Sequence, residues 1–140
     1  MKIICNYNDP LNPPEGCPDK FDYGLTLGKE YLVMGMVLYK DSNILYFLID
    51  EDGSPSCFPF LLFSIKDNSI PDNWCILLNP KEENRYTFEN HIYYICGFKE
   101  LSNDENYYFE LVLREKEAMT IYFQRKMELE KYYEDLEYLR

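Results

Sequence analysis

The sequence predicts an α+β fold, in which a small antiparallel β-barrel is followed by C-terminal helices, the last of them long. Two long apolar runs, residues 30–40 and 44–50, meet across a polar turn, and a shorter aromatic run follows at residues 55–66. Short apolar runs bounded by turn residues are typical of covered strands. From residue 102 the apolar residues follow a helical period instead. A chain of 140 residues is expected to form one domain.

Residues 1–24 are expected to form a proline-rich lead-in to the barrel. Four prolines lie between positions 10 and 18, and proline excludes a central strand or a helix interior because it fixes φ and lacks an N–H donor. Residues 1–4 are expected to form a short edge strand. Because Cys17, Phe21 and Tyr23 offer apolar surface, we expect the lead-in to cover the barrel; the alternative is a mobile segment.

Residues 25–101 are expected to be mostly β-structure. The first strand, 30–40, contains Gly35, which indicates a bulge or a sharp bend. Residues 50–53 predict a tight hairpin turn, because Gly53 tolerates a positive φ. Pro59 ends the returning strand. The other elements expected here are strands at 44–50, 55–58, 64–66, 74–78 and 92–97, and one helical turn at 60–63.

Residues 102–140 are expected to be helical. Ser102 and Glu105 have the spacing of a capping box, which predicts a helix over 104–114; a strand is the alternative, because 107–113 is dense in aromatic and branched residues. Residues 117–139 contain no Gly or Pro and predict a long helix. We expect its apolar stripe to pack on the barrel. The stripe consists of Ala118, Tyr122, Leu129, Tyr132, Leu136 and Leu139.

The net charge of −11 is concentrated in the first four-fifths of the chain. Residues 1–113 hold eight Lys and Arg against eighteen Asp and Glu, a net charge of −10, whereas residues 114–140 carry −1. An acidic surface repels nucleic acid and membrane phosphate and attracts basic partners. We therefore expect a protein partner, with no nucleic acid and no membrane.

The residues predict no catalytic, metal or cofactor site. His91 is the one histidine, and the five cysteines include no Cys-x-x-Cys pair, so no zinc-site spacing exists. The six glycines form no phosphate-binding motif. The apolar stretch at the N-terminus is far shorter than that of a signal peptide, and no run could span a membrane. We therefore expect a cytoplasmic, non-enzymatic protein with reduced thiols.

Three motifs follow one another in the β-rich part of the chain. They are Leu25-Thr26-x-Gly28-Lys29-x-Tyr31-x-Val33, Tyr46-x-Leu48-Ile49-Asp50-Glu51-Asp52-Gly53 and Phe58-Pro59-x-x-Leu62-Phe63-x-Ile65. This order resembles small bacterial SH3-like barrel proteins, which include immunity proteins of polymorphic toxin systems such as contact-dependent growth inhibition. The resemblance covers about residues 25–78, implies an SH3-like barrel more than a function, and transfers no functional residue.

Charge and resemblance together predict an immunity protein that binds and neutralises a cognate toxin domain, expected to be a basic nuclease. Carboxylates would speed encounter and fix register, and exposed tyrosines would anchor the contact. The alternative is a non-catalytic regulatory or peptide-binding barrel module, dimeric through residues 132–139, from Tyr132 to Leu139. An enzyme would require perturbed carboxylates facing each other in a deep pocket. The expected partner-binding residues are Asp50, Glu51, Asp52, Asp67, Asp72, Glu82 and Glu83.

Overall fold

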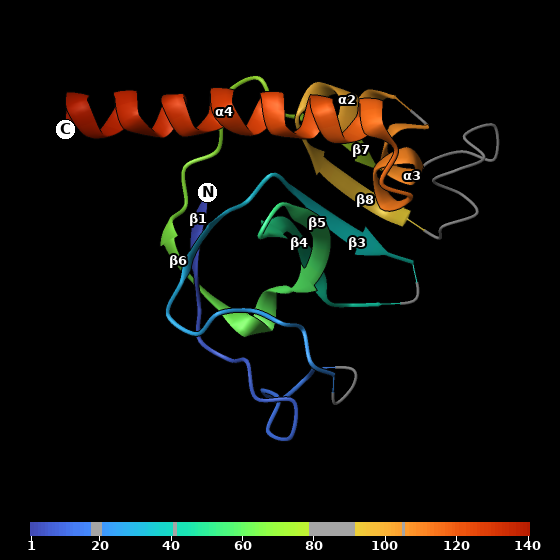
Figure 1. Ribbon diagram of the computed structural model, residues 1–140, viewed down its shortest axis with the longest axis vertical. Coiled ribbons are helices and arrows are strands. Elements are labelled where there is room, and N and C mark those ends of the chain that lie inside the picture. Colours follow the sequence, from blue (N-terminus) through green and yellow to red (C-terminus); the bar gives the residue numbers. More distant parts are fainter. Residues whose placement is uncertain (18–20, 41, 79–91, 105) are drawn as a thin grey trace.

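Two antiparallel β-sheets lie beneath a long C-terminal helix in the computed structural model (Figure 1). The structure describes residues 1–17, 21–40, 42–78, 92–104 and 106–140. The fold is therefore α+β, and the last helix is long, as the sequence predicts. Among the described helices none is both long enough and apolar enough to cross a membrane.

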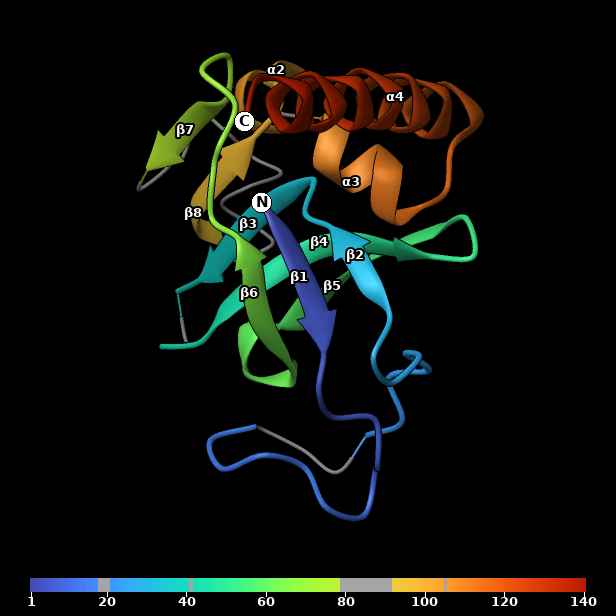
Figure 2. The same cartoon turned by 90° about the vertical axis from the view of Figure 1, so that its left-hand side faces the viewer.

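The first sheet has three strands in the order β2-β1-β6 (Figure 2). The bounds are Lys2–Cys5 for β1, Glu30–Leu32 for β2 and Phe63–Asp67 for β6. Strand β1 lies in the centre, with Ile3 opposite both Tyr31 and Ile65. The prediction of an edge strand at the N-terminus was wrong, because both neighbours of β1 come from later parts of the chain and no local pattern announces them.

The second sheet has five strands in the order β5-β4-β3-β8-β7. Strands β4 and β5 form the predicted hairpin, and its turn has positive φ angles at Asp52 (49°) and Gly53 (81°). The predicted helical turn after Pro59 is the 3-10 turn η1. The bounds are Gly35–Tyr39 for β3, Leu45–Glu51 for β4, Ser54–Pro59 for β5, Phe60–Leu62 for η1, Cys75–Leu78 for β7 and Ile92–Gly97 for β8.

The strand predicted over residues 30–40 is divided between the two sheets. The amide of Val33 donates to the carbonyl of Met1 in the first sheet (3.0 Å), and the amide of Met34 donates to Leu48 in the second (2.8 Å). The interruption falls at Val33 and Met34, just before Gly35, which begins β3. Gly35 itself lies in a crowded position, where a Cβ would lie 2.3 Å from Cδ2 of Leu101. Although this segment links them, the two sheets do not close into one hydrogen-bonded barrel.

Three helices follow the sheets: α2 (Lys99–Asn103), α3 (Tyr107–Val112) and α4 (Lys116–Leu139). The prediction of a helix, rather than a strand, within residues 104–114 is confirmed by α3. The predicted capping box at Ser102 was wrong, because Ser102 is buried within α2 and its hydroxyl donates to the carbonyl of Phe98 (3.4 Å). A hydroxyl that is already paired inside a helix cannot cap the next helix.

The buried face of α4 consists of Ala118, Tyr122, Leu129 and Tyr133. The stripe predicted from the sequence also includes Leu139 at its C-terminal end, but Leu139 is 81% exposed. The difference has a simple cause: steps of four and three residues average 3.5, while a straight α-helix has 3.6 residues per turn and drifts by about 20° per heptad. The C-terminal end of α4 extends beyond the strands (Figure 1).

The core has two parts. One lies between the helices and the five-stranded sheet, and it includes Tyr107 and Tyr122. The other lies between the two sheets, around Ile3 and Ile49. Beyond β1, the proline-rich lead-in adds less to the core: Cys17 and Tyr23 pack against the second part, and the ring centroids of Tyr23 and Phe58 lie 6.1 Å apart, but Phe21 is 60% exposed. The expectation of a packed cover therefore holds for Cys17 and Tyr23 and was wrong for Phe21.

Candidate functional site

Asp50, the first of the predicted binding residues, holds α4 against the sheet. Its side chain is 7% exposed, and its carboxylate lies 2.9 Å from Nζ of Lys126. The hydroxyl of Tyr122 donates to the same carboxylate at 3.2 Å. Both partners come from α4, so Asp50 is occupied by an internal role and presents little of its charge to solvent.

Glu51 and Asp67 are also paired inside the molecule. Glu51 accepts hydrogen bonds from Lys29 (3.2 Å) and from Tyr31. Burial acts to raise the pKa of Glu51, but these hydrogen bonds outweigh it, and the pKa lies below its ordinary value. Hydrogen bonds from the hydroxyl and amide of Ser69 lower the pKa of Asp67 to about 2.

Two predicted residues remain exposed, and they lie at different places. Asp52 is 89% exposed in the β4–β5 turn, with Lys29 at 3.9 Å. Asp72 is exposed in the turn before β7. Glu82 and Glu83 lie outside the described residues. The five described members of the predicted set therefore form no single surface.

A group of carboxylates outside the predicted set, one of them half-buried and the others exposed, lies around α3 and the start of α4. We call it the acidic corner. Burial and the neighbouring negative charges together raise the pKa of Glu110. The guanidinium of Arg114 donates to Ser54 (3.1 Å), which places the corner beside the β4–β5 turn. The members of the acidic corner are Asp104, Glu110, Glu115 and Glu117. Their density in the sequence is a signal that could have brought them into the predicted set.

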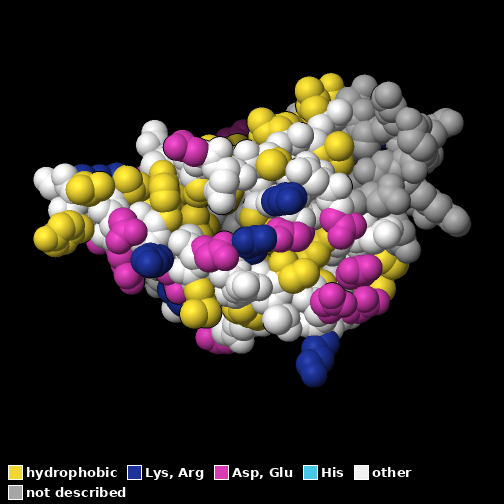
Figure 3. All heavy atoms as spheres, turned by 90° about the horizontal axis from the view of Figure 1, so that it is seen from above, with side chains coloured by type: hydrophobic (Ala, Val, Ile, Leu, Met, Phe, Trp, Pro, Cys, Tyr) yellow, Lys and Arg dark blue, Asp and Glu magenta, His cyan; other side chains and the backbone are white. Residues whose placement is uncertain are grey.

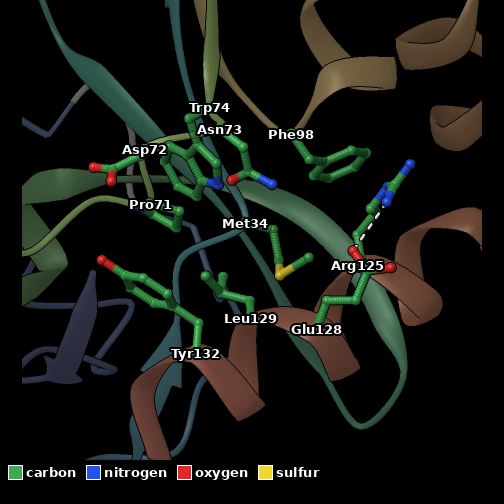
Figure 4. Close-up of a pocket in the computed structure, with 10 residues that line it drawn as sticks. All are labelled: Met34, Pro71, Asp72, Asn73, Trp74, Phe98, Arg125, Glu128, Leu129 and Tyr132. Carbon is green, nitrogen blue, oxygen red and sulfur yellow. Dashed lines mark hydrogen bonds and ion pairs between the residues drawn. The ribbon is translucent and has the colours of Figure 1, made fainter. Parts of the chain in front are cut away.

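A cavity of about 260 Å³ lies between α4 and the turn before β7 (Figure 4). We call it the Trp74 cavity. Its walls are mainly apolar. The lining residues are Met34, Pro71, Asp72, Asn73, Trp74, Phe98, Arg125, Glu128, Leu129 and Tyr132.

Distant parts of the chain build the Trp74 cavity. A turn closed by the amide of Trp74 and the carbonyl of Pro71 (3.2 Å) carries the indole ring to one wall. Leu129 and Tyr132 of α4 form the opposite wall, and Phe98, just before α2, forms a third side (Figure 4). The side chain of Asn73 extends between Trp74 and Phe98 in this view, while the carboxylate of Asp72 points away from the centre.

The mouth of the cavity carries an excess of negative charge. Nε of Arg125 donates to both carboxylate oxygens of Glu100 at 3.1 Å, and its Nη1 donates to Glu128 at 2.9 Å. Glu100, which is not itself a lining residue, also has Lys99 near it. These two carboxylates are therefore matched by two cations. Asp72 adds a third carboxylate, which makes no hydrogen bond or ion pair with any other described residue. Figure 3, which looks down on α4, shows basic and acidic side chains interspersed over this face.

A second groove, of about 560 Å³, lies between α4 and the first sheet and is lined by charged residues, among them Asp50 and Asp52. Its ions are largely paired with one another: Lys126 binds Asp50 at 2.9 Å and Lys2 binds Glu137 at 3.2 Å. Because these charged side chains are paired within the molecule, few of them are free to bind a ligand or a partner. The Trp74 cavity is therefore the better candidate site.

Cys57, Tyr39 and Tyr108 form the other polar cluster of note. The two hydroxyls lie 2.7 Å apart, and Sγ of Cys57 lies 3.5 Å from that of Tyr108. Burial raises the pKa of Cys57 to about 11, so the thiol is protonated at neutral pH and is a poor nucleophile. In the part of the chain that the structure describes, no three His, Cys, Asp or Glu side chains are grouped to hold a metal ion.

The chain matches no protein-family model, no curated protein and no solved structure. The candidate site therefore has to be interpreted from its own geometry.

Proposed function

We propose that this protein is a non-catalytic binding protein that neutralises a basic toxin domain, such as a nuclease, in the manner of a bacterial immunity protein. The observation that carries the proposal is the net charge of −10 over residues 1–113. A field of that sign attracts a basic partner, speeds its encounter and opposes binding to nucleic acid. Blocking a nuclease requires only that carboxylates and apolar contacts occupy the surface that phosphates would otherwise reach.

The acidic corner supports this proposal. Like charges that lie close together destabilise the folded chain, and the raised pKa of Glu110 reflects part of that cost. Asp52 lies in the turn that Arg114 contacts through Ser54, so it extends the acidic surface. In the free protein this repulsion between carboxylates remains, and a bound cationic partner would reduce it.

The SH3-like barrel is part of the same proposal. Its first motif covers the turn before β2 and β2 itself, the second covers β4 and the β4–β5 turn, and the third runs from the end of β5 through η1 into β6. We infer that the bend after Val33, where one chain segment passes between the sheets, is where such a barrel has opened.

Co-expression with the toxin encoded beside this gene tests the proposal. We expect growth to be protected and a complex to be recovered whose affinity falls as salt is raised. Replacing the three glutamates of the acidic corner by glutamine should weaken the complex. A matched variant, Glu130→Gln, Glu134→Gln and Asp135→Asn on α4, removes the same charge elsewhere and should weaken it less. No protection and no complex at any salt concentration would refute the proposal.

The exposed end of α4 favours a second candidate, a regulatory or peptide-binding module that dimerises through residues 132–139. Tyr138 is 91% exposed and Leu139 81% exposed. Sedimentation equilibrium distinguishes the two candidates: a dimer that Tyr138→Ser with Leu139→Ser converts to a monomer supports this one. A wild-type monomer at every concentration excludes the dimeric form.

A further inference from the structure

We propose that the Trp74 cavity is an anchor pocket for one large apolar side chain of a protein partner, and that Lys or Arg residues flank that side chain in the partner. The basic flanks rest on the function proposed above. The pocket, its occupant and its rim are argued from the cavity itself.

The size of the cavity favours a single side chain. Pockets that hold drug-sized ligands or cofactors usually have volumes of about 300–1,000 Å³. The Trp74 cavity, at about 260 Å³, lies just below that range. It therefore suits one side chain of the size of leucine or phenylalanine, with its backbone outside the mouth.

The walls favour an apolar occupant. Met34, Phe98 and Leu129 offer no charge, and the rings of Trp74 and Tyr132 can meet an aromatic guest edge to face. A Lys or Arg side chain inserted from outside would place its charge against these apolar walls, and desolvation would oppose it. An apolar side chain instead exchanges water-exposed surface for contact on several sides.

The rim favours basic neighbours. Asp72 points outward, beside the mouth, and no described residue neutralises it (Figure 4). Glu100 and Glu128 are matched by Arg125 and by the nearby Lys99, so Asp72 is the excess negative charge of the rim. A partner with Lys or Arg next to its anchor would place cations against this excess negative charge, whereas an acidic partner would be repelled. An apolar centre with a charged rim is the usual arrangement of a binding hot spot.

Short peptides test the pocket without the toxin. The probe is the capped tripeptide Arg-Phe-Arg, compared with Arg-Ala-Arg, which lacks the anchor, and Glu-Phe-Glu, which reverses the flanks. The readout is the indole N–H cross-peak in a ¹H–¹⁵N NMR spectrum, because the chain has one tryptophan. We expect Arg-Phe-Arg to shift this peak saturably. Arg-Ala-Arg should bind about tenfold or more weakly, and Glu-Phe-Glu about fivefold or more weakly at low salt.

Two variants separate the rim from general electrostatics. Asp72→Lys reverses an exposed charge that makes no described bond, so folding should be retained, and it should weaken Arg-Phe-Arg but strengthen Glu-Phe-Glu. Asp52→Lys is the matched control, because Asp52 is equally charged and lies outside the cavity. Its effect on both peptides should be small.

The outcomes are separable from those of the toxin experiment. Three results would each overturn the anchor pocket, even if the protein still protects against a toxin. They are equal shifts of the indole peak with Arg-Phe-Arg and Arg-Ala-Arg, a shift that does not saturate, and equal effects of the two lysine variants. Saturable binding of Arg-Phe-Arg in a protein that gives no protection would instead reject the proposed function and retain the pocket.

Discussion

Replacing Asp50 by asparagine should loosen α4 from the sheet. The carboxylate accepts from Lys126 at 2.9 Å and from Tyr122 at 3.2 Å, and its side chain is 7% exposed. The substitution preserves shape but leaves the lysine ammonium without its counter-charge. Removing one partner of a fully buried pair costs about 3–5 kcal/mol. Since the Lys126 side chain is 25% exposed and can reach water, we expect a loss of about 2 kcal/mol.

Urea unfolding, followed by circular dichroism and by Trp74 fluorescence, measures this loss as a change in midpoint at constant slope. Asp52→Asn is the control. Because Asp52 is exposed, the free energy of unfolding of this variant should differ from that of the wild type by less than about 0.5 kcal/mol.

A double-mutant cycle separates pairing from burial. Lys126→Met alone leaves the Asp50 carboxylate with Tyr122 as its remaining partner and should also destabilise the protein. The combination with Asp50→Asn should cost less than the sum of the two single changes, because neither charge is then left unpaired. If Asp50→Asn costs no more than Asp52→Asn, or the two losses simply add, the carboxylate is not what holds α4 in place.

Three further predictions concern stability and reactivity. Gly35→Ala should cost about 2 kcal/mol in urea unfolding, because the new methyl group would meet Leu101 at 2.3 Å; an unchanged midpoint would contradict the tight approach. The pKa of Asp67 is lowered from 3.8 to about 2 and that of Glu51 is also lowered, so the unfolded chain binds more protons in acid. Their stabilisation is present above about pH 4 and is lost towards pH 2, and Asp67→Asn should flatten that decline in a series of unfolding midpoints. Cys57, with a pKa of about 11, should resist iodoacetamide at pH 7.5 in the folded protein and react after denaturation. Equal labelling of both states, read by mass spectrometry of the Cys57 peptide, would show that the thiol is not protected.

The local elements were predictable because short-range patterns specify them. The β4–β5 hairpin follows from Gly53, which can adopt a positive φ, and η1 follows from Pro59. The long helix follows from a run without glycine or proline. The central position of β1 was not predictable, because its pairing partners arrive some 28 and 60 residues later and hydrogen bonding has no sequence signal at that range.

The same division applies to the candidate site. Asp50 and Asp72 both belong to acidic turn regions, and residue order alone makes them equivalent. Folding separates them: Lys126, 76 residues away, neutralises Asp50, whereas no described residue neutralises Asp72. Residues 74–78 were predictable as a strand, but the cavity beside Trp74 exists because α4 lies opposite the turn that carries it.

Composition and periodicity, which are properties of the chain in any conformation, suffice for the class of fold, the long helix and the acidic character. Contacts between distant residues decide which carboxylates remain free, which face of α4 is buried and where the Trp74 cavity forms. Those contacts form when the two sheets and α4 pack together. The physical reason is that the net charge is a sum over the residues and does not depend on conformation. Whether one carboxylate is free to bind depends instead on which side chains the fold brings within a few ångströms of it.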